Sequence, residues 1–243
     1  MANIDIKSYI DQLRQYLPYV PLVPVEAISA LHRKRDLGGI VKLIRNTMNV
    51  NVHLVLHWTD EVRGNAPAWV TVPKRMPYYG TPEFKKIRID MFIRKSFAEA
   101  EPYDRFAIAV AHEFSHVVLD SIDHPLRHDE KAVDLTAMIL GFSHLYRRAA
   151  YTIRRVSLNE FQRRGLGYLS EHELDQACQI LVPRSVRAKY AASRALWHAK
   201  HRAINALLLP ATLLVLALGV GVVAEAFDFL SDFLKRHLAA LHW

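Results

Sequence analysis

Side chains suited to metal chemistry lie close together in the sequence His112-Glu113-Phe114-Ser115-His116. Residues four apart project from the same face of an α-helix, so the imidazoles of His112 and His116 can reach one metal ion. Zinc accepts imidazole nitrogens at about 2.0–2.1 Å. Glu113 is displaced around the helix, where a carboxylate can take a proton from a metal-bound water. The spacing H-E-x-x-H therefore predicts a catalytic zinc site with Glu113 as the general base.

The residues around the motif, 106–111 and 117–119, are mostly apolar, which is typical of a buried helix. Histidine and glutamate side chains are costly to bury without a strong partner, and a metal ion is such a partner. The alternative is a fortuitous match in a chain with 13 histidines. That alternative predicts a protein that binds no stoichiometric metal.

A catalytic zinc ion needs a third protein ligand and one open position. Glu130 and Asp134 are four residues apart at the start of a second segment with helical spacing of apolar residues. One of these carboxylates can bind the metal while the other accepts the N–H of a ligating histidine. The residues alone leave open which of the two carboxylates is the ligand.

H-E-x-x-H followed by a helix with E-x-x-x-D resembles the gluzincin group of zinc metallopeptidases, over about residues 103–142. The resemblance implies that His112, His116 and Glu130 hold one zinc ion per chain. It also implies that Asp134 accepts a hydrogen bond from His112. The short spacer before the third ligand is similar to that of a compact relative. The fold implied is α+β and zincin-like, a small antiparallel sheet with active-site helices.

Hydrolysis of a peptide bond also needs a group that stabilises negative charge on the carbonyl oxygen. His124 and His128 belong to the predicted loop between the two metal helices, because Pro125 breaks regular structure there. Tyr146, Arg147 and Tyr151 are further candidates for the oxyanion or the substrate. The sequence does not choose among these residues.

The function expected from these residues is hydrolysis of a protein or peptide substrate by a zinc-bound water that Glu113 activates. In a cytosolic setting we expect a regulatory peptidase with a specific substrate. The alternative function is a catalytically inactive, zincin-like protein that binds a partner or acts as a scaffold at the membrane. A site without catalysis has no physical need for Glu113, which favours the enzyme.

A long apolar segment near the C-terminus predicts a single transmembrane helix. Residues 203–224 contain no charged side chain, and as a helix they reach about 33 Å, enough to cross the hydrocarbon core. Basic residues precede this segment, so the positive-inside rule predicts a cytoplasmic catalytic domain. Residues 225–243 are expected to form a short amphipathic tail. The expected alternative is a buried core helix or hairpin.

The rest of the chain predicts a catalytic domain over residues 1–150 and a helical juxtamembrane extension over residues 151–202. The domain is expected to contain N-terminal helices, a sheet, and two metal helices, over 1–47, 50–95, 103–121 and 129–148. The strand near residues 86–94 is expected to border the cleft and to pair with an extended substrate.

The net charge and the cysteine content restrict the partners and the cellular compartment that we expect. The net charge is +8, but no helix-turn-helix or zinc-finger spacing accompanies it, so no nucleic-acid partner is expected. Many of the basic residues lie just before the apolar segment and fit membrane topology instead. The single cysteine, Cys178, excludes an intramolecular disulfide and fits a reducing compartment. An oligomer remains compatible with the sequence.

Overall fold

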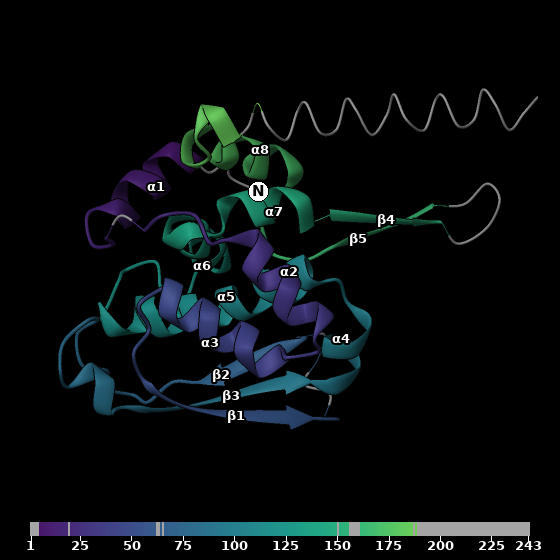
Figure 1. The fold of residues 1–243 in the computed structure, drawn as a ribbon. Coiled ribbons are helices and arrows are strands. Elements are labelled where there is room, and N and C mark those ends of the chain that lie inside the picture. Colours follow the sequence, from purple (N-terminus) through teal and green to yellow (C-terminus); the bar gives the residue numbers. More distant parts are fainter. Residues whose placement is uncertain are drawn as a thin grey trace, which may run out of the picture. The chain divides into compact units, whose positions relative to one another are not determined.

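The structure is a computed structural model, and it describes residues 5–18, 20–61, 64, 66–149, 151–155, 161–186 and 188. The fold is α+β: a mixed three-stranded sheet, a two-stranded hairpin, and helices (Figure 1). The chain divides into two compact units, Met1–Pro183 and Arg184–Trp243. All helices and strands described below belong to the first unit.

Three amphipathic helices form the N-terminal part: α1 (Ile6–Arg14), α2 (Val25–Arg33) and α3 (Leu37–Thr47). Each buries its apolar side, for example Ile10 of α1, Ile28 of α2 and Ile40 of α3, all with no exposed surface. Asp36 caps α3 by accepting the N–H of Gly39 at 2.8 Å. Figure 1 shows α2 and α3 on the same side of the sheet as the central helix α5 (Tyr103–Ser121).

The sheet contains β1 (His53–Thr59), β2 (Ala68–Thr71) and β3 (Arg88–Arg94), in the order β1-β3-β2. β1 pairs with β3 in parallel, and β2 pairs with β3 in the antiparallel direction. The prediction of an antiparallel sheet was therefore wrong for one of the two pairs. A parallel pair needs a long crossover, and the segment between β1 and β3, which includes β2, supplies one. Alternation of side chains along a strand does not depend on direction, so the sequence could not show this.

The strand register separates an inner and an outer face of the sheet. Ile89, Met91 and Ile93 of β3 are fully buried on the helix side. On the other side, the register aligns His57, Phe92 and Trp69 across the three strands. Their rings stack with centroids 4.5 Å and 5.4 Å apart. Such cross-strand contacts fix the register that positions β2 beside α5.

β2 lies at the edge of the sheet, and within the described strands it pairs only with β3. The expectation that residues 86–94 pair with a substrate is therefore wrong, because both edges of β3 are already hydrogen-bonded to β1 and β2. The segment between β2 and β3 contains a short 3-10 turn, η1 (Phe84–Lys86), with Phe84 buried. After β3 the chain forms α4 (Lys95–Ala100) and then enters α5.

The second metal helix, expected as one element over residues 129–148, is divided in three. It begins as α6 (Glu130–Ala137), continues as a π-helical turn η2 (Met138–Phe142), and ends as α7 (Ser143–Ala149). The break occurs at Gly141, whose φ is +104°. The carbonyl of Gly141 accepts the N–H of Val23 at 3.0 Å, so the turn holds the segment that precedes α2.

Replacing Gly141 with Ala is expected to destabilise the protein by about 2–4 kcal/mol, because the positive φ is strained for Ala and a Cβ clashes with backbone. The added Cβ would lie 2.7 Å from the carbonyl oxygen of Pro21. Gly80→Ala is the matched control: its φ is +80° and its Cβ would meet nothing within 4 Å. The free energy of unfolding of both variants, measured in urea, separates the effect of the clash from that of the backbone strain. Equal losses in the two variants would contradict the account.

The region expected as a helical extension, residues 151–202, begins instead with a β-hairpin. β4 (Tyr151–Arg155) pairs antiparallel with β5 (Phe161–Gly165). α8 (Glu171–Leu181) follows, with the expected capping box between Ser170 and Glu173. α8 packs on α1 and α7. It therefore belongs to the first compact unit, which extends to Pro183 and not to residue 150.

The expected membrane segment, residues 203–224, and the expected amphipathic tail, residues 225–243, lie outside the described residues. Within the described residues, no helix has both the length and the apolar character needed to span a bilayer.

Candidate metal centre

The central helix α5 positions His112, Glu113 and His116. It is surrounded by other elements, and its neighbouring residues Val110, Ala111 and Phe114 are fully buried. The two histidines keep one edge accessible: 13% of the His112 side chain and 22% of the His116 side chain are exposed. Their rings are 5.0 Å apart and nearly perpendicular. The helix thus presents both imidazoles to a common space.

The helix α6 brings Glu130 into that space. Asp129 caps α6 by accepting the N–H of Lys131 at 2.8 Å, and it also accepts the hydroxyl of Tyr9 at 2.8 Å. Glu130 is therefore the first residue of a helix whose start is fixed. α6 packs directly against α5.

Glu130 approaches both imidazoles at distances close to those in a zinc site. Glu130 Oε2 lies 3.2 Å from His112 Nε2 and 3.5 Å from His116 Nε2. A tetrahedral ion with bonds of about 2.0–2.1 Å has ligand atoms about 3.3–3.4 Å apart. Glu130 Oε2 is buried and has no partner that meets hydrogen-bond geometry. The nearby nitrogens, Nε2 of His112 and Nε2 of His116, are close enough for an ion pair. These three are the one group of such side chains, within the described residues, that could hold a metal ion.

Asp134, one turn after Glu130, fixes the orientation of His112. Its side chain is 1% exposed, and its Oδ1 accepts the N–H of His112 Nδ1 at 2.8 Å. The same oxygen accepts the hydroxyl of Tyr146 at 2.9 Å, and Oδ2 accepts the backbone N–H of Tyr168 at 2.6 Å. When His112 is neutral, this hydrogen bond keeps the proton on Nδ1 and leaves the lone pair of Nε2 free to bind a metal ion.

The segment Gly165–Leu169 is part of the centre, which the sequence reasoning recognised only as a break between helices. Gly167 has a φ of +100°, and a Cβ there would lie 2.8 Å from Asp134 Oδ2. Glycine thus lets the backbone reach the carboxylate. The Tyr168 ring stacks on the His112 ring, with centroids 5.6 Å apart and planes at 22°. The available signal was a glycine followed by an aromatic residue directly before a capping box.

The metal-free centre holds a proton on His112. Burial lowers the pKa of this imidazole, but its contacts with Asp134 and Glu130 outweigh burial and raise the pKa to about 10. Burial and the charge of His112 lower the pKa of His116 to about 4. The contact with His112 lowers the pKa of Glu130. The raised pKa of His112 stabilises the metal-free fold fully below the ordinary value of 6.5, and this stabilisation is lost as the pH rises through about 10.

Binding of zinc at about pH 6 is expected to release about one proton per ion, because the metal requires neutral His112. Calorimetric titration in buffers with different ionisation enthalpies measures this number. The affinity should rise about tenfold per pH unit as the competing proton is diluted. His53→Gln, an exposed histidine on β1, should leave the proton count unchanged. Zinc binding without proton release would contradict the protonation of His112.

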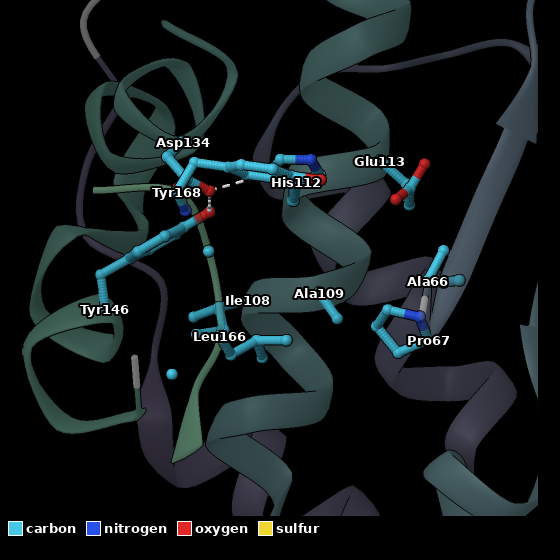
Figure 2. A pocket seen from close by; sticks show the side chains of 13 residues that line it. Ala66, Pro67, Ile108, Ala109, His112, Glu113, Asp134, Tyr146, Leu166 and Tyr168 are labelled. Carbon is cyan, nitrogen blue, oxygen red and sulfur yellow. Dashed lines mark hydrogen bonds and ion pairs between the residues drawn. The ribbon is translucent and has the colours of Figure 1, made fainter. Parts of the chain in front are cut away.

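A cavity of about 470 Å³ lies next to the centre. Figure 2 shows Ala66 and Pro67, just before β2, on the right, Tyr146 and Asp134 on the left, and His112 of α5 between them. Its remaining wall is mostly apolar: Ala68, Ile108, Ala109 and Leu166. The start of β2, apolar side chains and Glu113 therefore line the same cavity.

The candidates for the oxyanion differ in their placement. Arg147 is exposed and does not line the cavity, and the side chain of Tyr151 lies outside the part that the structure describes. Tyr146 lines the cavity but is 2% exposed, and its hydroxyl is used by Asp134. His124 is 2% exposed, accepts the backbone N–H of Leu126 at 3.1 Å and contacts Tyr16 edge-on. His128 is exposed. Neither histidine lines the cavity.

Comparison of the chain with protein-family models, with curated proteins and with solved structures found no match. The functional argument therefore depends on the geometry of this site.

Proposed function

We propose that this chain is a membrane-anchored zinc metallopeptidase with its catalytic unit in the cytoplasm. The observation that carries the proposal is the convergence of three side chains: Glu130 Oε2 lies 3.2 Å from His112 Nε2 and 3.5 Å from His116 Nε2, close to the separation that a tetrahedral zinc ion requires. Glu113 lies beside this site and lines the adjoining cavity. Three ligands, a general base and space for a substrate are the components of a hydrolytic zinc centre.

Each group has a role in peptide hydrolysis. A zinc ion held by the three ligands would polarise the scissile carbonyl and acidify a water molecule. Glu113 accepts the proton of the attacking water and returns it to the amine that leaves. Asp134 holds His112 in the tautomer that leaves Nε2 without a proton.

Substrate binding follows from the walls of the cavity. Among the described strands, β2 pairs only along one edge, and its other edge could hydrogen-bond an extended peptide, as in β-strand addition. The apolar wall formed by Ile108, Ala109 and Leu166 favours an apolar side chain next to the cleaved bond. Each well-buried apolar group changes the rate by about 10–200-fold in such a pocket. The proposed substrates are therefore polypeptides with an aliphatic or aromatic residue at that position.

Incubation of the zinc-loaded protein with a defined peptide mixture, followed by mass spectrometry, tests this function. We expect new termini next to Leu, Ile or Phe, with cleavage of matched Asp or Lys peptides at least about 10-fold slower. Leu166→Asp should reduce that preference, whereas Ile180→Asp, on the exposed side of α8, should not. Cleavage indifferent to the neighbouring residue would contradict the substrate class.

The second function is a zincin-like scaffold that binds a partner at the membrane and does not catalyse. It shares the metal ligands with the peptidase, so zinc binding does not separate the two. The scaffold has no use for Glu113 or for an open cavity beside it. A protein that binds one zinc ion and cleaves no peptide would favour the scaffold.

A further inference from the structure

The cavity offers few side chains that could stabilise a developing oxyanion, and this limits the choice of donor. The residues that line it are mostly apolar. The polar side chains among them are His112, Glu113, Asp134, Tyr146 and Tyr168. Peptide hydrolysis places negative charge on the carbonyl oxygen, and a positioned hydrogen-bond donor there contributes strongly to the rate. The inference below rests on the proposed peptidase function.

Four of these five side chains have other roles. Glu113 and Asp134 are carboxylates, which repel an oxyanion. His112 directs Nε2 to Glu130 and uses Nδ1 to donate to Asp134. Tyr146 donates its hydroxyl to Asp134 and is almost fully buried. Among the described polar side chains that line the cavity, only that of Tyr168 remains as a donor.

The position of Tyr168 is fixed from both sides. Its backbone N–H donates to Asp134 Oδ2 at 2.6 Å, and its ring stacks on His112. The chain after it enters the capping box of α8, where the carboxylate of Glu173 binds Lys131 of α6 at 2.7 Å. A donor held in this way needs little reorganisation when the charge develops.

The hydroxyl of Tyr168 is available. The residue is 56% exposed, and its hydroxyl makes no hydrogen bond within the described part of the chain. Figure 2 shows the side chain extending from the Asp134 side across His112, toward the side on which Glu113 lies. A phenol hydroxyl is a hydrogen-bond donor at neutral pH, so this group can donate to a substrate oxygen.

We propose that the Tyr168 hydroxyl is a catalytic group that donates a hydrogen bond to the carbonyl oxygen of the scissile peptide as that oxygen becomes negative. No bond to Tyr168 forms or breaks, and its proton stays on the phenol. The sequence offered His124, His128, Tyr146, Arg147 and Tyr151 for this role, and Tyr168 is outside that set.

Tyr168→Phe is the test, because Phe keeps the stacking on His112 and the backbone hydrogen bond to Asp134. We expect kcat to fall by about 10²–10³-fold, with KM and zinc affinity within about threefold of the wild type. A phosphinic peptide, which imitates the tetrahedral transition state, should lose affinity by the same factor as kcat/KM. Tyr78→Phe, an exposed tyrosine away from the cavity, should match the wild type in all three measurements.

Tyr146→Phe gives a contrasting pattern if the roles are assigned correctly. Loss of its hydrogen bond to Asp134 should weaken zinc binding first, by about 10-fold or more. A Tyr168→Phe protein with full kcat would overturn the inference while leaving the peptidase intact. Loss of zinc in parallel with activity would also overturn it, because the role of Tyr168 would then be structural. A wild type that cleaves no peptide would instead contradict the proposed function itself.

Discussion

Glu113→Gln is expected to reduce peptide hydrolysis by about 10²–10⁴-fold while one zinc ion per chain remains bound. Glu113 is adjacent to a ligand on α5 and lines the cavity, but it is not part of the cluster of three ligand atoms. Gln has the same shape and keeps a carbonyl oxygen that can orient water. It has no carboxylate that could accept the proton, so binding should survive and turnover should not.

Rates of peptide cleavage and zinc content, measured on the same preparation, check this prediction. Glu99→Gln on the exposed side of α4 is the matched control and should behave as the wild type. Full activity in Glu113→Gln would contradict the role of Glu113 as the general base. Loss of zinc in this variant would show that Glu113 takes part in metal binding, although it lies outside the cluster of three ligand atoms.

Asp134→Ala should weaken both the metal site and the fold. The carboxylate is almost fully buried and accepts hydrogen bonds from His112, Tyr146 and the backbone of Tyr168. Its removal leaves these donors without an acceptor and frees the orientation of His112. Zinc affinity should fall about 10–100-fold, and the free energy of unfolding of the metal-free protein should fall by about 3–5 kcal/mol.

Chelator competition and urea denaturation measure the two effects. Asp60→Ala removes an aspartate from an exposed ion pair with Lys95, whose atoms are 2.8 Å apart, and should cost at most about 1 kcal/mol. Asp134→Asn keeps the volume of the side chain and one acceptor, so it should lie between the wild type and Asp134→Ala. An Asp134→Ala protein with unchanged zinc affinity would contradict the role of this residue.

The sequence predicts the elements with strong local patterns. α5 spans Tyr103–Ser121, as its continuous apolar spacing indicates. The α+β class and the capping box of α8 follow in the same way from local signals. These features depend on side chains within a few residues of one another.

The sequence alone did not predict the features that depend on contacts between residues far apart in the chain. The parallel pairing of β1 with β3 depends on how the chain crosses over, and alternation in each strand is the same for both directions. The division of the second metal helix depends on Gly141, whose carbonyl binds Val23, far away in the sequence. The hairpin β4–β5 has a mixed composition that does not separate strand from helix.

The same distinction applies to the site. The spacing of His112 and His116 on one helix is a local signal, and the structure brings Glu130 to them from the next helix. The participation of Tyr168 depends on a backbone N–H that reaches Asp134 because Gly167 has no side chain. The sequence gives the order of the side chains along the chain. It does not show which backbone groups will lie next to a given side chain in the fold.

Metal content tests the central claim most directly. The purified protein, supplied with zinc, should be measured beside His116→Ala and Glu130→Ala, with His128→Ala as the control from outside the cluster. We expect one zinc ion per chain in the wild type and in the control, and loss of zinc in both ligand variants. Wild-type protein without stoichiometric zinc, or zinc that survives both ligand substitutions, would contradict the account.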